Sequence, residues 1–206
     1  METKRHWENV YATKGERHVS WYQEHALASM DLIRRTGAPK SARIIDIGGG
    51  ASTFVDDLLA AGYRDVTVLD VSAEALHAAQ RRLGERTASV AWIEADITEA
   101  ALPRQAYDIW HDRAVFHFLT DAGARRRYVE AALAAVKPGG HVIVATFGPQ
   151  GPLQCSGLPI VRYSPGALHR EFGDRFRLIE HREEAHVTPA GAVQQFVYCY
   201  CRKQDA

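Results

Sequence analysis

Apolar and polar positions alternate in a regular order from residue 42 onward. Short apolar runs are typical of strands that are buried on both faces of a sheet, and they predict five strands, at 42–47, 66–69, 90–93, 107–110 and 141–147. Longer segments with apolar residues at helical spacing predict helices between them, at 52–61, 72–83 and 120–136. This alternation indicates a mostly parallel sheet with helices on both faces, which is a doubly wound α/β fold.

The two ends of the chain depart from this order. Apolar residues recur at roughly helical spacing over residues 18–35 and predict a helix there. Near the C-terminus, a predicted helix at 164–172 is followed by two alternating apolar–polar runs, at 176–180 and 194–201, with no helix between them. Two consecutive strands form a hairpin, so we expect an antiparallel pair at one edge of the sheet.

Composition narrows the class of protein. Of the 206 residues, 46% are hydrophobic and 24% are charged, as in globular proteins. Lys plus Arg (25) balances Asp plus Glu (25), so no net charge attracts nucleic acid or an anionic membrane. No apolar run approaches the ~20 residues of a membrane span, and the N-terminus lacks a signal-peptide apolar segment. We therefore expect a cytoplasmic protein of one domain, 1–206, with a helical N-terminal cap (1–40) and an α/β core (41–206).

A glycine-rich loop follows the first predicted strand. Asp46 precedes three consecutive glycines, Gly48, Gly49 and Gly50, at the point where a strand gives way to a helix. Glycines let a ligand approach the backbone, and a helix N-terminus offers free N–H groups. Asp70 ends the second strand about 20 residues further on, where an acidic residue can bind the hydroxyls of an adenosyl ribose. NAD and S-adenosylmethionine both fit so far, although the dinucleotide fingerprint would have glycine in place of Thr53.

From residue 42 to its C-terminal end, the chain resembles the class I S-adenosylmethionine-dependent methyltransferases. The segment from Asp46 to Ser52 is similar to the family's acidic, glycine-rich loop. Asp70 falls on the family's ribose-binding acid, and Asp96 falls on the segment that contacts the adenine. The turn at 136–140 and the C-terminal hairpin are similar too, and the hairpin separates this family from dinucleotide-binding folds.

The resemblance implies a Rossmann-like, seven-stranded sheet of order 3-2-1-4-5-7-6. It also implies methyl transfer by in-line displacement, with S-adenosylmethionine as cofactor and S-adenosylhomocysteine as product. The residues expected at the cofactor are Asp46, Gly48, Gly49, Gly50, Asp70, Val71, Asp96, Ile97 and His111. No histidine or cysteine spacing indicates a metal site.

Candidate residues for the methyl acceptor lie outside the glycine loop. His111 and Asp112, after the fourth strand, are candidate catalytic residues, and Arg113 is suited to a carboxylate. Substrate contacts are also expected from a further set: Trp21, Tyr22, Cys155 and Arg162. For the two aromatic residues and the cysteine, packing as buried residues is the alternative explanation. Cys155 suits a thiol or another soft acceptor, and Arg162 suits an anionic group.

The sequence leaves several functions open. A small-molecule acceptor is favoured, because the chain offers no second domain and the segment from Trp110 to Arg113 differs from the Asn/Asp-Pro-Pro-aromatic motif of base-modifying enzymes. The alternatives are protein lysine methylation, an NAD-dependent oxidoreductase and a non-catalytic protein that binds S-adenosylmethionine. The oligomeric state and the identity of the acceptor do not follow from the sequence.

Overall fold

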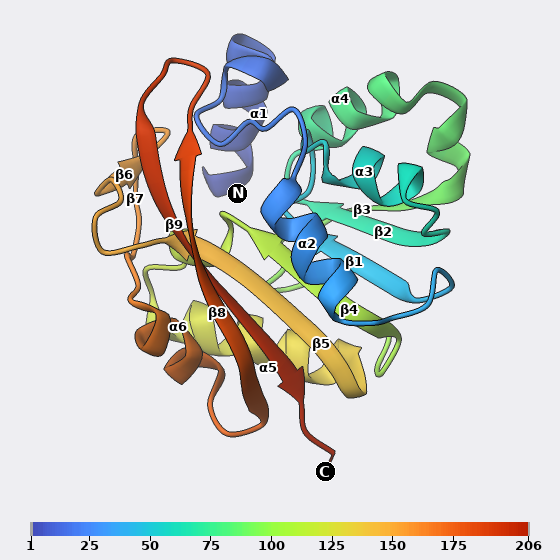
Figure 1. The fold of residues 1–206 in the computed structure, drawn as a ribbon. Coiled ribbons are helices and arrows are strands. Elements are labelled where there is room, and N and C mark those ends of the chain that lie inside the picture. The colour runs from blue at the N-terminus through green and yellow to red at the C-terminus, as the bar shows by residue number, and fades with distance from the viewer. Residues whose placement is uncertain (1, 206) are drawn as a thin grey trace.

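A computed structural model describes residues 2–205 and contains the predicted seven-stranded sheet (Figure 1). Its spatial order is β3-β2-β1-β4-β5-β9-β8, which is 3-2-1-4-5-7-6 when the seven strands are numbered along the chain. The strands are β1 (Arg43–Ile47), β2 (Asp65–Asp70), β3 (Val90–Glu94), β4 (Tyr107–Arg113), β5 (Val136–Phe147), β8 (Phe176–Val187) and β9 (Val193–Lys203). The fold class and strand order predicted from the sequence are confirmed. Met1 and Ala206, the ends of the predicted domain, lie outside the described residues.

The parallel and antiparallel parts of the sheet meet at β5. Strands β1 to β5 pair in parallel, whereas β9 pairs antiparallel with both β5 and β8. The C-terminal hairpin predicted at the sheet edge is therefore present. A separate two-stranded ribbon, β6 (Gln154–Cys155) and β7 (Leu158–Pro159), lies in the segment after β5.

Helices cover both faces of the sheet. The helices are α1 (Glu2–Lys14), α2 (Leu27–Arg35), α3 (Phe54–Ala60), α4 (Ala73–Leu83), α5 (Ala122–Ala135) and α6 (Pro165–Phe172). Side chains alternate across β1, so Ile44 packs with Leu32 and Phe54 on one face. Ile45 joins a second buried cluster that contains Tyr128, on the other face. One apolar strand thus supplies two cores, as expected for a strand buried on both faces.

The helix predicted over residues 18–35 is wrong in its first half. Only Leu27–Arg35 is α-helical, after a short 3₁₀ turn at Glu16–His18 and an irregular stretch. Backbone carbonyls of that stretch have partners elsewhere in the fold: Ser20 O accepts from His186 Nε2 (2.7 Å), Trp21 O from Arg113 Nη1 (3.1 Å), and Gln23 O from Thr53 Oγ1 (2.9 Å). These tertiary hydrogen bonds replace the helical ones, and local spacing does not reveal them.

Helix α1 is attached to the core through the N-terminus of α4. Glu8 accepts hydrogen bonds from the backbone N–H groups of Ala73 (2.9 Å) and Glu74 (3.1 Å) and from Ser72 Oγ (3.1 Å). These hydrogen bonds lower the pKa of Glu8, against the opposing effect of burial. A carboxylate at a helix N-terminus satisfies free donors and interacts favourably with the helix dipole. Glu8 therefore holds α1 beside α4, where Figure 1 shows the two helices.

We predict that Glu8→Ala lowers the free energy of unfolding by about 1 kcal/mol, the usual value of a helix N-cap side chain. Chemical denaturation followed by circular dichroism measures the change. Asn9→Ala is the matched control, because the exposed side chain of Asn9 forms no hydrogen bond within residues 2–205; Thr13 Oγ1 donates to its backbone carbonyl at 2.6 Å, which the substitution keeps. Equal stability of the two variants would contradict the assigned role of Glu8.

Candidate active site

The loop between β1 and α3 packs so closely that it requires glycine. A Cβ atom at Gly48 would lie 2.0 Å from Val115 Cγ2, and Gly48 also has a φ of +65°. A Cβ at Gly49 would lie 2.2 Å from Asp46 Oδ2, and one at Gly50 would lie 2.5 Å from Asp70 Oδ2. Such distances exclude a side chain, so the loop backbone stays directly against the carboxyl ends of the strands.

A cavity of about 370 Å³ opens beside this loop, at the carboxyl ends of β1, β2 and β3. Its lining combines five residues predicted at the cofactor with three aromatic residues from the N-terminal segment: Gly48, Asp70, Val71, Asp96 and Ile97, with Trp7, Tyr11 and Trp21. Trp7 packs edge to face on Trp21 and on Phe118, with ring centroids 5.7 Å and 5.0 Å apart. The N-terminal segment thus forms an aromatic roof over the cavity.

The two carboxylates predicted at the cofactor, both on this cavity, differ in environment. Asp70 is buried, and its Oδ2 accepts from the backbone N–H of Gly50 (3.0 Å) while its Oδ1 accepts from that of Ser72 (2.9 Å). Burial raises the pKa of Asp70 to about 6, with a smaller contribution from the charge of Asp46 and despite these hydrogen bonds. Asp96 is exposed, and its Oδ1 accepts from Thr98 N and Thr98 Oγ1, both at 2.8 Å.

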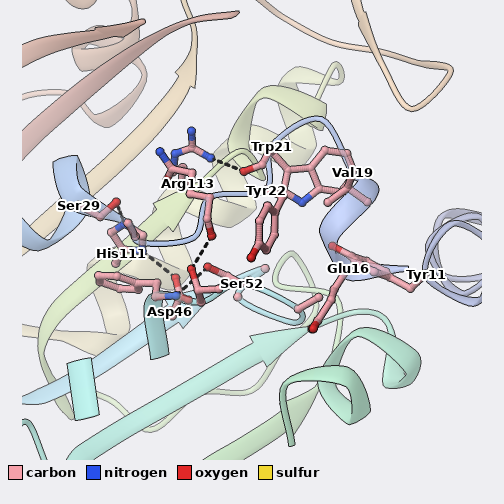
Figure 2. A pocket seen from close by; sticks show the side chains of 17 residues that line it. Tyr11, Glu16, Val19, Trp21, Tyr22, Ser29, Asp46, Ser52, His111 and Arg113 are labelled. Atoms are coloured by element: carbon pink, nitrogen blue, oxygen red, sulfur yellow. Dashed lines mark hydrogen bonds and ion pairs between the residues drawn. The ribbon is translucent and has the colours of Figure 1, made fainter. Parts of the chain in front are cut away.

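A second, smaller cavity of about 40 Å³ is also lined by Gly48, and Figure 2 shows the side chains around it. Asp46, Gly49 and His111 line it, together with Tyr22, Glu16 and Ser29 from the N-terminal segment. The two cavities adjoin, because they have four lining residues in common: Tyr11, Trp21, Gly48 and Arg113. Gly50 is the one glycine of the loop that lines neither cavity; it contacts Asp70 instead.

The two predicted catalytic residues, His111 and Asp112, both use their polar atoms in hydrogen bonds within the protein. His111 is 2% exposed and has a partner on each ring nitrogen: Asp46 Oδ1 lies 2.7 Å from Nδ1, and Ser29 Oγ lies 2.8 Å from Nε2. Ser29 is a site residue that the sequence analysis missed, because it lies in a helical apolar pattern with no motif around it. A histidine engaged at both nitrogens is not free to take a proton directly from a substrate.

Asp112 lines neither cavity. Its Oδ2 accepts from the hydroxyl of Tyr128 (2.6 Å) and from Phe116 N (3.1 Å), and its Oδ1 accepts from Val115 N (2.9 Å). Burial raises the pKa of Asp112 to about 7, although these donors oppose the shift. This geometry argues against the catalytic role predicted for Asp112. Its carboxyl group instead fixes the loop that presses Val115 against Gly48.

The predicted acceptor residues divide into two groups. Trp21, Tyr22 and Arg113 line the cavities, whereas Cys155 and Arg162 line neither. Cys155 is 4% exposed within the apolar core, and burial raises its thiol pKa to about 11, which disfavours the reactive thiolate. Arg162 Nη1 donates to the carbonyls of Pro149 (2.8 Å) and Gly151 (3.2 Å). Neither residue therefore lines a cavity, and their contact with an acceptor stays a prediction.

The guanidinium group of Arg113 is engaged by other residues of the protein. Its guanidinium donates to Trp21 O (3.1 Å) and to the hydroxyl of Tyr198 (3.1 Å), and it pairs with Glu184 at 3.4 Å. Glu184 also accepts from Gln23 Nε2 at 2.8 Å. This network connects the β8–β9 hairpin to the segment that carries Trp21 and Tyr22.

The site has the donor and acceptor groups that S-adenosylmethionine requires. Asp46 Oδ2 is buried beside the glycine loop and has no hydrogen-bond partner within residues 2–205. A buried carboxylate oxygen without a partner is costly unless a ligand donor meets it, and the cofactor carries an α-ammonium group. Asp70 and Asp96, on the larger cavity, provide carboxylates for its ribose and adenine. The chain's residues therefore fit this cofactor.

Comparison with known proteins gives a consistent result. Residues 44–140 match the family model described as a methyltransferase domain. The chain is 25% identical over 117 residues to the eEF1A lysine and N-terminal methyltransferase of Mus musculus, covering 56% of this chain and 16% of that protein. It is 33% identical over 108 residues to an uncharacterized methyltransferase of Mycobacterium tuberculosis, covering 50% of each. The chain thus spans half or less of the length of these curated relatives.

A solved structure shares nearly the whole fold. The 1,6-didemethyltoxoflavin-N1-methyltransferase of Burkholderia thailandensis, which contains 1,6-didemethyltoxoflavin and S-adenosylhomocysteine, superposes with a TM-score of 0.71 at 19% identity. The match covers 99% of this chain and 85% of that one. It confirms the Rossmann-like architecture, including the N-terminal segment and the C-terminal hairpin.

We predict that affinity for S-adenosylhomocysteine falls as the pH is lowered through 6. Asp70 must be ionised to accept two ribose hydroxyls, and its pKa is about 6 because of burial. Protonation below that pKa therefore opposes binding, and affinity at pH 5 should be about tenfold weaker than above pH 7. Calorimetric titration at several pH values measures the slope. Asp70→Asn should bind more weakly and lose this pH dependence, and an unchanged slope in that variant would contradict the assignment.

Proposed function

We propose that this chain, whose residues 44–140 belong to the class I S-adenosylmethionine-dependent methyltransferases, transfers a methyl group to a nucleophilic atom of a small molecule. The observation that carries the proposal is the partial aromatic cover that the N-terminal segment gives the site. Residues from α1 and from the segment before α2 line both cavities beside the glycine loop. A concave, aromatic pocket with a few polar groups is typical of small-molecule sites.

The two cavities suggest a division of the cofactor between them. Asp70, Val71, Asp96 and Ile97 would bind the adenosine part in the larger cavity, and Asp46 with the glycine loop would bind the methionine part. When bound, S-adenosylmethionine supplies a methyl group already activated on its sulfonium. The protein's own contribution is then to align the acceptor and to exclude water.

Two ion pairs connect the N-terminal segment to the α/β core. Lys4 pairs with Glu94, and Arg82 pairs with Glu16 at 2.6 Å and with Asp56 at 2.8 Å. Trp21 and Tyr22 are then available to contact an acceptor from above, beside Arg113. We assign no general base, because His111 and Asp112 have their polar atoms engaged within the fold. An acceptor that reaches the site unprotonated needs none.

Protein lysine methylation is the second candidate. The similarity to the mouse eEF1A lysine and N-terminal methyltransferase supports it, although that match covers 16% of the relative. A lysine side chain is narrow enough to enter an aromatic channel, and aromatic faces attract an ammonium group. The similarity to the Burkholderia enzyme, which binds 1,6-didemethyltoxoflavin, covers a larger share of this chain and favours the first candidate.

Labelled S-adenosylmethionine distinguishes the candidates. Incubation of the purified protein with labelled S-adenosylmethionine and a cell extract should transfer label to the low-mass fraction. A screen of single candidate acceptors should then begin with thiols and small amines. Label confined to a protein band would instead support lysine methylation. Gly50→Val is the control for dependence on the loop, because its side chain would collide with Asp70. Binding of NADH and not of S-adenosylhomocysteine would overturn the proposal altogether.

Two aromatic residues provide a matched test of the division between cavities. Tyr22 lines only the smaller cavity, and Trp7 lines only the larger one. We predict that Trp7→Ala weakens S-adenosylhomocysteine about tenfold, because it removes a large apolar contact. Tyr22→Ala should weaken S-adenosylhomocysteine less than Trp7→Ala does, because only the amino-acid part of the ligand enters the smaller cavity, and it should also lower transfer to the acceptor found in the screen. The reverse pattern would contradict the assignment of the cavities.

A further inference from the structure

A continuous chain of buried hydrogen bonds crosses three elements beside the smaller cavity. It runs from Ser29 on α2, through His111 on β4, to Asp46 on β1, with separations of 2.8 Å and 2.7 Å. The three residues are 0%, 2% and 2% exposed, respectively, and all three line the same cavity. Figure 2 shows them in line, with the two contacts dashed.

The proton positions along these hydrogen bonds follow from the carboxylate of Asp46. An ionised Asp46 only accepts, so Nδ1 of His111 carries the proton that it donates to Asp46 Oδ1. In the neutral ring, Nε2 is then an acceptor, and the hydroxyl of Ser29 donates to it. The ring of Phe54 packs against the imidazole with a centroid separation of 4.0 Å, which fixes the plane of the ring. Asp46 therefore sets the tautomer of His111, and the hydroxyl of Ser29 holds the other ring nitrogen in place.

The same arrangement leaves one oxygen of Asp46 unused. Oδ1 is held by His111, whereas Oδ2 is buried without a partner among the described residues and lies against the backbone of Gly49. Because the position of Oδ1 is fixed, Oδ2 is fixed as well, on the side of the glycine loop. A donor that enters this cavity meets a carboxylate oxygen held in place rather than one that must be reoriented.

We propose that Ser29 and His111 are positioning residues that hold Asp46 Oδ2 ready for the α-ammonium group of S-adenosylmethionine. This inference rests on the cofactor site of the proposed function, but it needs no methyl acceptor. It gives α2, in the N-terminal segment, a part in cofactor binding that acts through His111 and Asp46, from a residue that no glycine-loop motif includes.

Two ligands that differ in the methionine part test the proposal. S-adenosylhomocysteine carries the α-ammonium group, whereas 5′-methylthioadenosine has the same adenosine and no amino acid. Ser29→Ala should weaken the first about tenfold, because His111 loses one of its two partners and no longer holds Asp46 Oδ2 in place for the ammonium group. The second should change less than about twofold. Ser29→Thr, which keeps the hydroxyl, should restore most of the affinity, and His111→Phe, which keeps the packing on Phe54, should behave as Ser29→Ala does.

Asp96→Asn is the matched control on the adenosine side, and it should weaken both ligands by the same factor. If Ser29→Ala also lowers the affinity for both ligands equally, or for neither, the three hydrogen-bonded residues serve only to anchor α2 and the proposal is wrong. Thermal denaturation of each variant identifies those that do not fold.

Nitrogen-15 NMR of the histidine rings in the unmodified protein provides a second test: His111 should be protonated at Nδ1 and not at Nε2, and the opposite tautomer would overturn the inference. Absence of methyl transfer to any small molecule would refute the proposed function while leaving the comparison of these two ligands unaffected.

Discussion

Burial of the Asp46 carboxylate is the constraint on which the rest of the site depends. A buried charge requires partners, and the parallel register supplies one by pairing Asp46 on β1 with His111 on β4. The remaining oxygen lies where a Cβ at Gly49 would approach within 2.2 Å, so the loop after β1 has to be glycine there. The ring of His111 then needs its own partner, which α2 provides as Ser29. One charge thus connects a strand pair, a loop and a helix.

The parts of this site that could be predicted from the sequence are those determined by patterns among residues close together in the sequence. Asp70 and Asp96 follow the ends of apolar strands, and parallel strands bring such ends to one edge of the sheet, so their meeting at one cavity followed from the pattern. Ser29, Glu8 and Glu184 could not be found in this way. The partner of Ser29 lies 82 residues away and the partner of Glu184 lies 71 residues away, and neighbouring residues do not encode those contacts.

The same reason explains the error over residues 18–35. The apolar spacing suited a helix, but the backbone before α2 forms its hydrogen bonds with Arg113, Thr53 and His186 instead. Two of these three partners belong to the sheet, and one of them, His186, lies near the far end of β8. The length of the β8–β9 hairpin, 12 and 11 residues, is therefore part of how the N-terminal segment is held over the cavities. Tertiary contacts outweighed local propensity where the chain builds the roof of its site.

The adjacent residues His111 and Asp112 show what strand geometry adds to a motif. Successive side chains of a strand point to opposite faces, so the two do not act on one substrate as a pair. His111 faces α2 and Phe54, beside the glycine loop, whereas Asp112 faces Tyr128 on α5. The first face contains the cavities, and the second contains the bonds that hold the loop after β4 in place. The polar groups of β4 therefore hold two different parts of the fold: His111 holds the carboxylate of Asp46, and Asp112 holds the loop after β4.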